Sequence, residues 1–167
     1  MKFFKNNLFI SILAFLLLLI DGHFSDLLTA LAGHSFFIQT HLFLIFFFYF
    51  LRFSTSDYFS YLLAFGIGLI YDSYYLSFIG IACIILPVLV YLIIKFSRYF
   101  GTPIRRILAF FIFLFLYDIS CYGLAVVYRL TTYSFSAFVT YQLVGSLIFN
   151  LLIFLVLSNI TYKRNSK

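Results

Sequence analysis

Long apolar runs separated by short polar segments dominate this chain. Apolar or nearly apolar runs cover residues 8–20, 42–51, 81–94 and 107–116. The apolar residues stand in blocks and do not alternate with polar ones, which excludes the pattern of a transmembrane β-barrel. Blocks of this kind are typical of helices that cross a lipid bilayer.

The spacing of the runs predicts six helices in one integral membrane domain that spans residues 1–167. About 20 residues are needed to cross a hydrocarbon core of about 30 Å, so a chain of 167 residues can hold six such segments joined by short loops. The expected helices lie at about 7–24, 36–53, 58–72, 76–95, 106–128 and 137–160. The predicted fold class is therefore an all-α membrane protein, a bundle of six transmembrane helices.

Two local features refine these helices. Ser56 or Asp57 is expected to be the N-cap of helix 58–72, because a short polar side chain there accepts a hydrogen bond from an N–H group of the first turn. The expected helix 36–53 is rich in Phe and has no small residue after its start. Tight helix contacts in membranes favour small residues, so we expect this helix to face lipid.

Composition agrees with a membrane location, and the charges predict an orientation. Hydrophobic residues make up 65% of the chain and charged residues 10%, which is too little charge to cover a soluble domain. Ten of the eleven Lys and Arg residues lie at the termini, at residue 52 and in segment 95–106, all on one side of the expected bundle. Arg129 alone lies on the other side. This bias predicts a multi-pass cell-membrane protein with both termini in the cytoplasm.

The net charge of +6 does not indicate a nucleic-acid partner, because the basic residues lie at helix ends. Their topological role is sufficient to explain them. Segment 95–106 is also placed to contact membrane lipid with anionic headgroups.

The first candidate site lies between residues 64 and 80. Ala64, Gly68 and Asp72 are spaced by four and share one helix face, so small residues lead up to a carboxylate. Gly80 follows in the turn to the next helix. A carboxylate at the end of so apolar a helix is costly unless a partner or water receives it. These four residues are expected to bind a partner helix or to shape the hairpin between helices 58–72 and 76–95. The alternative for Asp72 is a helix end at the interface, where its carboxylate lies in water or caps helix 76–95.

The second candidate site is a set of intramembrane polar residues. Asp118 lies about 18 Å along helix 106–128, near the middle of the membrane, where an isolated charge costs at least ~2.5–3.5 kcal/mol. Gln142, Ser146 and Asn150 recur at every fourth position of helix 137–160. This stripe is expected to face Asp118 or another helix inside the bundle, as polar contacts between helices or as a contact to a ligand.

Neither catalytic residues nor a metal or other cofactor are expected. The three histidines are expected on the outer side with two aspartates: His23, His34, His41, Asp21 and Asp26. The histidine spacings of eleven and seven residues match no metal site that we recognise.

The stretch from Gly68 to Asp72, followed by a Leu76 to Gly80 segment and Tyr91, resembles the MreD family of rod shape-determining proteins. That family typically shows Gly-Leu, then Asp, then a Leu-Gly or Pro-Gly pair that opens the next helix. Here the pair reads Ile79-Gly80, after Phe78, which departs from the common form. Chain length, six-helix threading and the basic ends are similar as well.

The resemblance implies a scaffold and not an enzyme. Members of the family act with MreC and other elongation proteins, namely a RodA-type glycosyltransferase, a penicillin-binding protein and MreB where present, to organise side-wall peptidoglycan synthesis. It also implies a bundle like that of the substrate-binding components of energy-coupling-factor transporters. By this resemblance Gly68, Asp72 and Gly80 would shape the helical hairpin.

A second interpretation is the substrate-binding membrane component of a small-molecule, vitamin-type transporter. Such components have the same size and helix count, and Asp118 with Gln142 and Asn150 would line the pocket. The first helix lacks the pattern of small residues that these components use to dock on their energising partner, since Ser11 is followed four residues later by Phe15.

An intramembrane aspartyl protease is the enzyme alternative. Asp72 and Asp118 each follow a Tyr at similar expected depth, and two carboxylates that share a proton can activate water. Such proteases carry Gly-x-Gly-Asp, whereas here the residue after Gly68 is Leu69.

Overall fold

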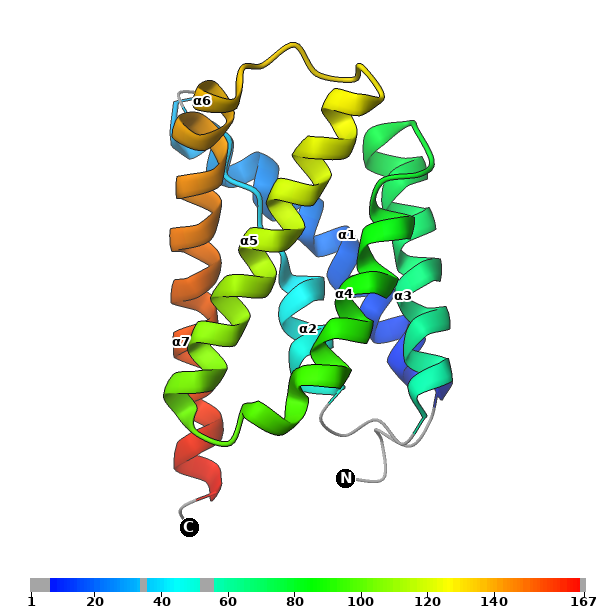
Figure 1. Ribbon diagram of the computed structural model, residues 1–167. Coiled ribbons are helices and arrows are strands. Elements are labelled where there is room, and N and C mark those ends of the chain that lie inside the picture. Colours follow the sequence, from blue (N-terminus) through cyan, green and yellow to red (C-terminus); the bar gives the residue numbers. More distant parts are fainter. Residues whose placement is uncertain (1–6, 34–35, 52–55, 166–167) are drawn as a thin grey trace.

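The computed structural model describes residues 7–33, 36–51 and 56–165, with side chains as far as Ser158. Its helices are α1 (Asn7–Leu31), α2 (Leu42–Phe50), α3 (Asp57–Tyr71), α4 (Ala82–Phe96), α5 (Pro103–Val127), α6 (Phe135–Phe138) and α7 (Val144–Asn165). A π-helical turn, Asp72–Leu76, extends α3, and a second one, Val139–Leu143, joins α6 to α7. Within the described residues there are six helical rods and no strand (Figure 1), which confirms the all-α six-helix class.

Four of the described helices are long and apolar enough to cross a membrane: Asn7–Leu31, Ala82–Tyr99, Pro103–Val127 and Phe135–Ser158. The longest helices, α1 and α5, are longer than the hydrocarbon core is thick, because their 25 residues measure about 37 Å and the core is about 30 Å thick. By contrast, α2 has nine residues and cannot span the core alone.

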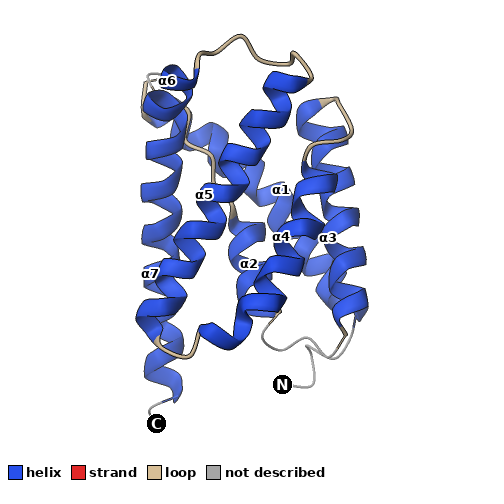
Figure 2. Ribbon diagram, in the orientation of Figure 1, coloured by secondary structure: helices blue, strands red, loops and turns tan. Residues whose placement is uncertain are grey.

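The expected helix at 36–53 is wrong in its first part. Only Leu42–Phe50 is helical, and residues 37–41 form neither helix nor strand. Figure 2 shows this part of the chain as a loop that enters the bundle and ends at the start of α2. We call residues 36–41 the inserted segment. It is irregular because Gln39, Thr40 and His41 bond to other helices through backbone and side-chain groups.

The expectation that this region faces lipid is also wrong. The buried side chains of α2 are Phe43, Leu44, Ile45, Phe47, Phe48 and Phe50. The ring of Phe48 contacts those of Phe110 and Phe154, with centroids 5.7 and 5.4 Å apart, and the latter two rings stack at 4.2 Å. Large aromatic side chains fill the space between helices that are not in backbone contact. The helices of this bundle therefore pack in two ways, by close backbone contact at small residues and by interlocking aromatic rings.

Helix α1 continues to Leu31 and does not end near residue 24. Asp21 does not stop it, because this side chain turns into the bundle and is 3% exposed. At the start of α3, the prediction of an N-cap is confirmed for Ser56, whose Oγ accepts a hydrogen bond from the N–H of Phe59.

The ends of the rods sort into two groups. The first residues of α1 and the last residues of α7 lie at the same end of the bundle, together with the turn between α4 and α5 (Figure 1). The turn that follows the π-helical extension of α3 and the loop between α5 and α6 lie at the opposite end.

Candidate functional site

Asp72 caps the start of α4 from the end of α3. Its side chain is fully buried, and Oδ1 accepts a hydrogen bond from the N–H of Ala82 at 2.8 Å. Oδ2 accepts from the N–H groups of Gly80, Ile81 and Cys83 at 3.0, 3.0 and 3.1 Å. The first N–H groups of a helix have no partner within it, and a carboxylate also complements the positive end of the helix dipole. One side chain therefore satisfies four donors and fixes α3 to α4.

Small residues bring α3 and α4 into backbone contact below this cap. Ala64 is fully buried, and a Cβ added to Gly68 would lie 2.5 Å from Cα of Cys83 and 2.7 Å from the carbonyl oxygen of Ala82. In the turn, Gly80 has a φ of 135°, which strains any residue with a side chain. All four residues of the first candidate site thus lie at the contact or the turn of one helical hairpin.

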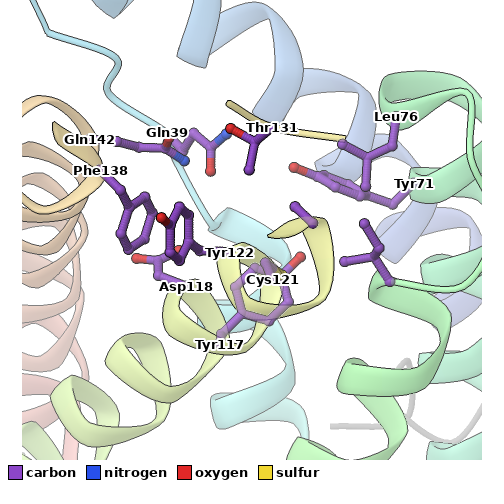
Figure 3. Close-up of a pocket in the computed structure, with 12 residues that line it drawn as sticks. Gln39, Tyr71, Leu76, Tyr117, Asp118, Cys121, Tyr122, Thr131, Phe138 and Gln142 are labelled. Atoms are coloured by element: carbon purple, nitrogen blue, oxygen red, sulfur yellow. The ribbon is translucent and has the colours of Figure 1, made fainter. Parts of the chain in front are cut away.

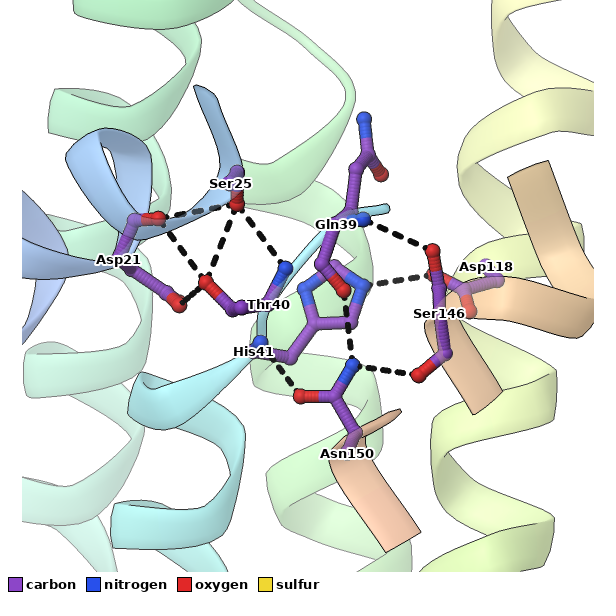
Figure 4. A network of polar contacts seen from close by, with 8 residues as sticks. All are labelled: Asp21, Ser25, Gln39, Thr40, His41, Asp118, Ser146 and Asn150. Carbon is purple, nitrogen blue, oxygen red and sulfur yellow. Dashed lines mark hydrogen bonds and ion pairs between the residues drawn. The ribbon is translucent and has the colours of Figure 1, made fainter. Parts of the chain in front are cut away.

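The inserted segment is bound by two side chains of α7. Asn150 Oδ1 accepts a hydrogen bond from the N–H of His41 at 2.8 Å, and Asn150 Nδ2 donates to the carbonyl oxygen of Gln39 at 2.8 Å. Ser146 Oγ accepts from the N–H of Gln39 at 2.9 Å (Figure 4). Irregular backbone at membrane depth is tolerated only when its polar groups find such partners within the protein.

The imidazole of His41 joins the inserted segment to α5. Its Nε2 lies 2.9 Å from Asp118 Oδ1, and the two residues are 1% and 5% exposed. The ring packs edge-on against Tyr117 with centroids 5.0 Å apart. This hydrogen bond offsets part of the cost of placing a carboxylate at this depth. Among the described residues, Asp118 Oδ2, His41 Nδ1 and the Tyr117 hydroxyl have no hydrogen-bond partner.

Thr40 ties the other side of the inserted segment to α1. Its Oγ1 lies within hydrogen-bonding distance of the Asp21 carboxylate and 2.9 Å from the Asp21 carbonyl oxygen. Its N–H donates to Ser25 Oγ at 2.9 Å. Figure 4 shows the segment held between α1 on one side and α5 and α7 on the other. We call these contacts, together with those of Gln39 and His41, the polar network.

A cavity of about 130 Å³ lies beside the polar network (Figure 3). Its lining comes from the inserted segment, the α3–α4 hairpin, α5, the loop after α5, and the rod that contains α6 and α7: Gln39, Tyr71, Leu76, Ile81, Tyr117, Asp118, Cys121, Tyr122, Ala125, Thr131, Phe138 and Gln142. Most of these side chains are polar or aromatic, and none is Lys or Arg.

The polar stripe of the last helix divides between two places. Ser146 and Asn150 bind the inserted segment, whereas Gln142 lines the cavity with Asp118. None of the three hydrogen-bonds to Asp118 in the described part of the chain, since the partner of that carboxylate is His41.

His41 and Asp21, which were expected on the outer side of the membrane, have side chains that are buried inside the bundle in the polar network. His23 is exposed, and His34 lies outside the described residues. The sequence signal that would have found His41 is its position: it follows Gln39 and Thr40 in the first two turns of an expected transmembrane helix. Three adjacent polar residues point in three directions around a helix, so at that depth they need partners on several sides.

The geometry does not provide a pair of catalytic carboxylates. Both carboxylate oxygens of Asp72 accept hydrogen bonds from backbone N–H groups, and Asp118 forms a hydrogen bond with His41. No hydrogen bond joins the two aspartates among the described residues, so they do not share a proton. In the same residues no three His, Cys, Asp or Glu side chains are grouped as metal ligands.

Comparison with known proteins identifies the family. The family model for rod shape-determining protein MreD matches residues 3–163. The chain belongs to the MreD family. The cell shape-determining protein MreD of Streptococcus pneumoniae (strain ATCC BAA-255 / R6) is 38% identical over 138 residues, which cover 80% of this chain and 81% of that protein. No solved structure matches the chain significantly.

Membership in the MreD family gives the chain a role in determining cell shape. It agrees with the four helices that are long and apolar enough to cross a membrane, and it confirms the resemblance noted around Gly68, Asp72 and Gly80. In this MreD-family chain, these residues form a hairpin whose second helix depends on a carboxylate from the first.

Proposed function

We propose that this chain is a non-catalytic membrane scaffold of the cell-elongation machinery, which maintains cell shape by organising side-wall peptidoglycan synthesis. The observation that carries the proposal is the MreD family match over residues 3–163. The relative from Streptococcus pneumoniae is named for cell-shape determination, and a scaffold is the role in that process that needs no reactive group.

The use of the buried polar groups supports a structural role. Asp72 binds four backbone N–H groups, and Asn150 binds three backbone groups. A catalytic carboxylate or amide has to reach a substrate, whereas these side chains hold helices and the inserted segment in place. Side-chain hydrogen bonds between membrane helices add only about 0.6 kcal/mol each on average when formed, so they mainly specify how the helices are arranged. Removing one partner costs more, because a buried polar group is then left unpaired.

We infer that the partners are MreC and other elongation proteins, namely a RodA-type glycosyltransferase, a penicillin-binding protein and MreB where present. Ala64, Gly68 and Asp72 are buried within the α3–α4 hairpin, so a partner helix meets the outer face of that hairpin. A shallow groove on α3 and its π-helical extension is lined by Leu69, Ile70, Ser73 and Tyr74. We call it the α3 groove.

Gly66 makes the α3 groove suitable for another helix. It is one turn before the groove, and a Cβ added there would meet no atom within 4 Å. A glycine on an open helix face lets a second backbone approach closely. The proposed contact is therefore a transmembrane helix of MreC or another elongation protein crossing α3 near Gly66.

Copurification with MreC tests this contact. Gly66→Leu should lower the amount of MreC recovered with the full chain at least fivefold, because the added side chain holds the partner away. The matched control is Gly123→Leu, on the exposed face of α5, where a Cβ would also meet no atom within 4 Å. Equal recovery of MreC with both variants would refute the α3 groove. Gly68→Leu is unsuitable, since it would break the hairpin itself.

The transporter interpretation has less support from the geometry of the polar residues. It required Asp118, Gln142 and Asn150 to line one pocket, but Asn150 is fully buried against the inserted segment and only the other two line the cavity.

A further inference from the structure

The proposed scaffold function does not involve the cavity beside the polar network. Its lining extends from Asp118, within α5, to Thr131 in the loop after that helix. From Asp118 to the end of α5 is about 14 Å along the helix axis. The cavity therefore connects the interior of the bundle with the end that holds this loop, opposite to the two termini.

The cavity has an acceptor character. Asp118 contributes the only carboxylate of the lining, and no Lys or Arg balances it there. His41 occupies Oδ1, while Oδ2 has no partner among the described residues. This second oxygen therefore still lacks a hydrogen-bond donor.

Other lining side chains favour a cation with N–H donors. Gln39, Gln142 and Thr131 offer oxygen acceptors, and no described residue hydrogen-bonds to either glutamine side chain. Tyr71, Tyr117, Tyr122 and Phe138 add aromatic rings, whose faces attract ammonium ions. Carboxylate, amide oxygens and ring faces together match the three donors and the charge of a primary ammonium group.

We propose that this cavity binds a small primary ammonium group, held by Asp118 and positioned by Gln142. The cavity is small, with a volume of about 130 Å³, so the group carries only a short alkyl chain. Two sources share this chemistry: a free alkylamine from the medium, and the ethanolamine headgroup of a lipid in the adjacent leaflet. The proposal does not depend on the partner contact at α3.

Equilibrium binding of radiolabelled methylammonium to the full chain in phosphatidylcholine nanodiscs tests the proposal. We expect one saturable site per chain. Asp118→Asn should weaken binding at least tenfold, because it removes the charge while keeping an oxygen acceptor for His41. Gln142→Leu should weaken it about threefold. Asp57→Asn, an exposed aspartate at the start of α3, is the matched control and should bind as the unmodified chain does.

The lipid composition distinguishes the two sources. If the headgroup is the occupant, replacing part of the phosphatidylcholine by phosphatidylethanolamine should abolish methylammonium binding. If a free amine is the occupant, the lipid should have no effect. Absence of saturable binding, or equal binding by Asp118→Asn, overturns the proposal. If Asp118→Asn does not fold, Gln142→Leu and Thr131→Val decide, and unchanged affinity in both overturns it.

Discussion

At the scale of single residues, Asp72 shows how much backbone one carboxylate can satisfy. Four N–H groups at the start of α4 converge on its two oxygens. Hydrogen bonds to a charged group contribute about 1.5–3 kcal/mol each. Replacing this side chain leaves several donors without a partner inside the bundle, where water does not replace it.

We expect Asp72→Ala to lower the free energy of unfolding by about 3 kcal/mol or more. Asp72→Asn should have an intermediate effect, because the amide keeps one acceptor oxygen. Unfolding of the purified chain in mixed micelles measures both. Asp26→Asn, an exposed residue of α1, should change stability by less than about 0.5 kcal/mol. Equal stability of Asp72→Ala and Asp26→Asn would contradict the capping role.

Asn150 makes a second residue-scale prediction possible. Asn150→Leu keeps the number and branching of the side-chain heavy atoms but leaves the N–H of His41 and the carbonyl oxygen of Gln39 without their partner. Each unsatisfied buried group costs about 1–3 kcal/mol, so stability should fall by about 3 kcal/mol. Gln142→Leu, whose side chain bonds to no described residue, should cost less than about 1 kcal/mol. The same unfolding assay compares the two, and a similar loss in both would argue against the role of Asn150.

Sequence reasoning found Asp72 and Asp118 because a charge in an apolar run is conspicuous. It did not find the partner of Asp118, and it left open whether Asp72 would lie in water, cap the next helix or meet a partner helix. The partners of Asp72 are backbone N–H groups, which every residue has and which a turn of unknown shape brings together. The partner of Asp118 lies 77 residues away, in a segment that was expected to be helical and is irregular.

At the scale of elements, two glycines of α3 have opposite roles. A Cβ on Gly68 would meet the backbone of α4 at 2.5 Å, whereas a Cβ on Gly66 would meet nothing within 4 Å. Backbone cannot move away as a flexible side chain can, so the first site is a contact between helices and the second is an open face.

Gly68→Ala should therefore separate α3 from α4 and destabilise the chain by about 2 kcal/mol or more. Gly66→Ala should be neutral or stabilise it by up to about 1 kcal/mol, since alanine favours helix over glycine. Thermal unfolding of the two variants side by side is the measurement. If both lower the melting temperature equally, the close approach at Gly68 does not exist.

The number and order of helices could be predicted because apolar runs and polar turns alternate along the chain. Which face of α2 points to the core could not be predicted from the sequence. In a membrane, side chains that face lipid and side chains that face the core are both apolar, so the pattern of Phe residues in 42–51 carries no information about direction. Helix α2 packs by interlocking rings such as Phe48 and Phe110, which the search for small residues overlooks.

At the scale of the whole molecule, the distribution of charge predicts the orientation in the membrane. Lys95, Arg98, Arg105 and Arg106 lie in the α4–α5 turn region, at the end of the bundle that also holds the last residues of α7. Arg129 lies in the loop at the opposite end. Lys and Arg favour the cytoplasmic side, so this arrangement predicts cytoplasmic termini.

Reporter fusions measure this orientation. Alkaline phosphatase fused after Gly101 should be inactive, because it stays in the cytoplasm, and the same enzyme fused after Tyr133 should be active. A cytoplasmic reporter at the same two positions should give the opposite pattern and serves as the control. Activity after Gly101 would mean that the bundle is inserted the other way round.

The inserted segment constrains the order in which the chain is assembled. Side chains of α7 that bind Gln39 and His41 lie 107–111 residues further along the chain, so those peptide groups stay unpaired until the last helix has left the ribosome. The nascent protein must shelter residues 36–41 beside water or against the insertion machinery while most of its helices are already in the bilayer. Packing of α7 against the inserted segment is then the step that completes folding. A chain that ends before Ser146 leaves the backbone N–H and C=O groups of Gln39 and His41 without these partners inside the membrane.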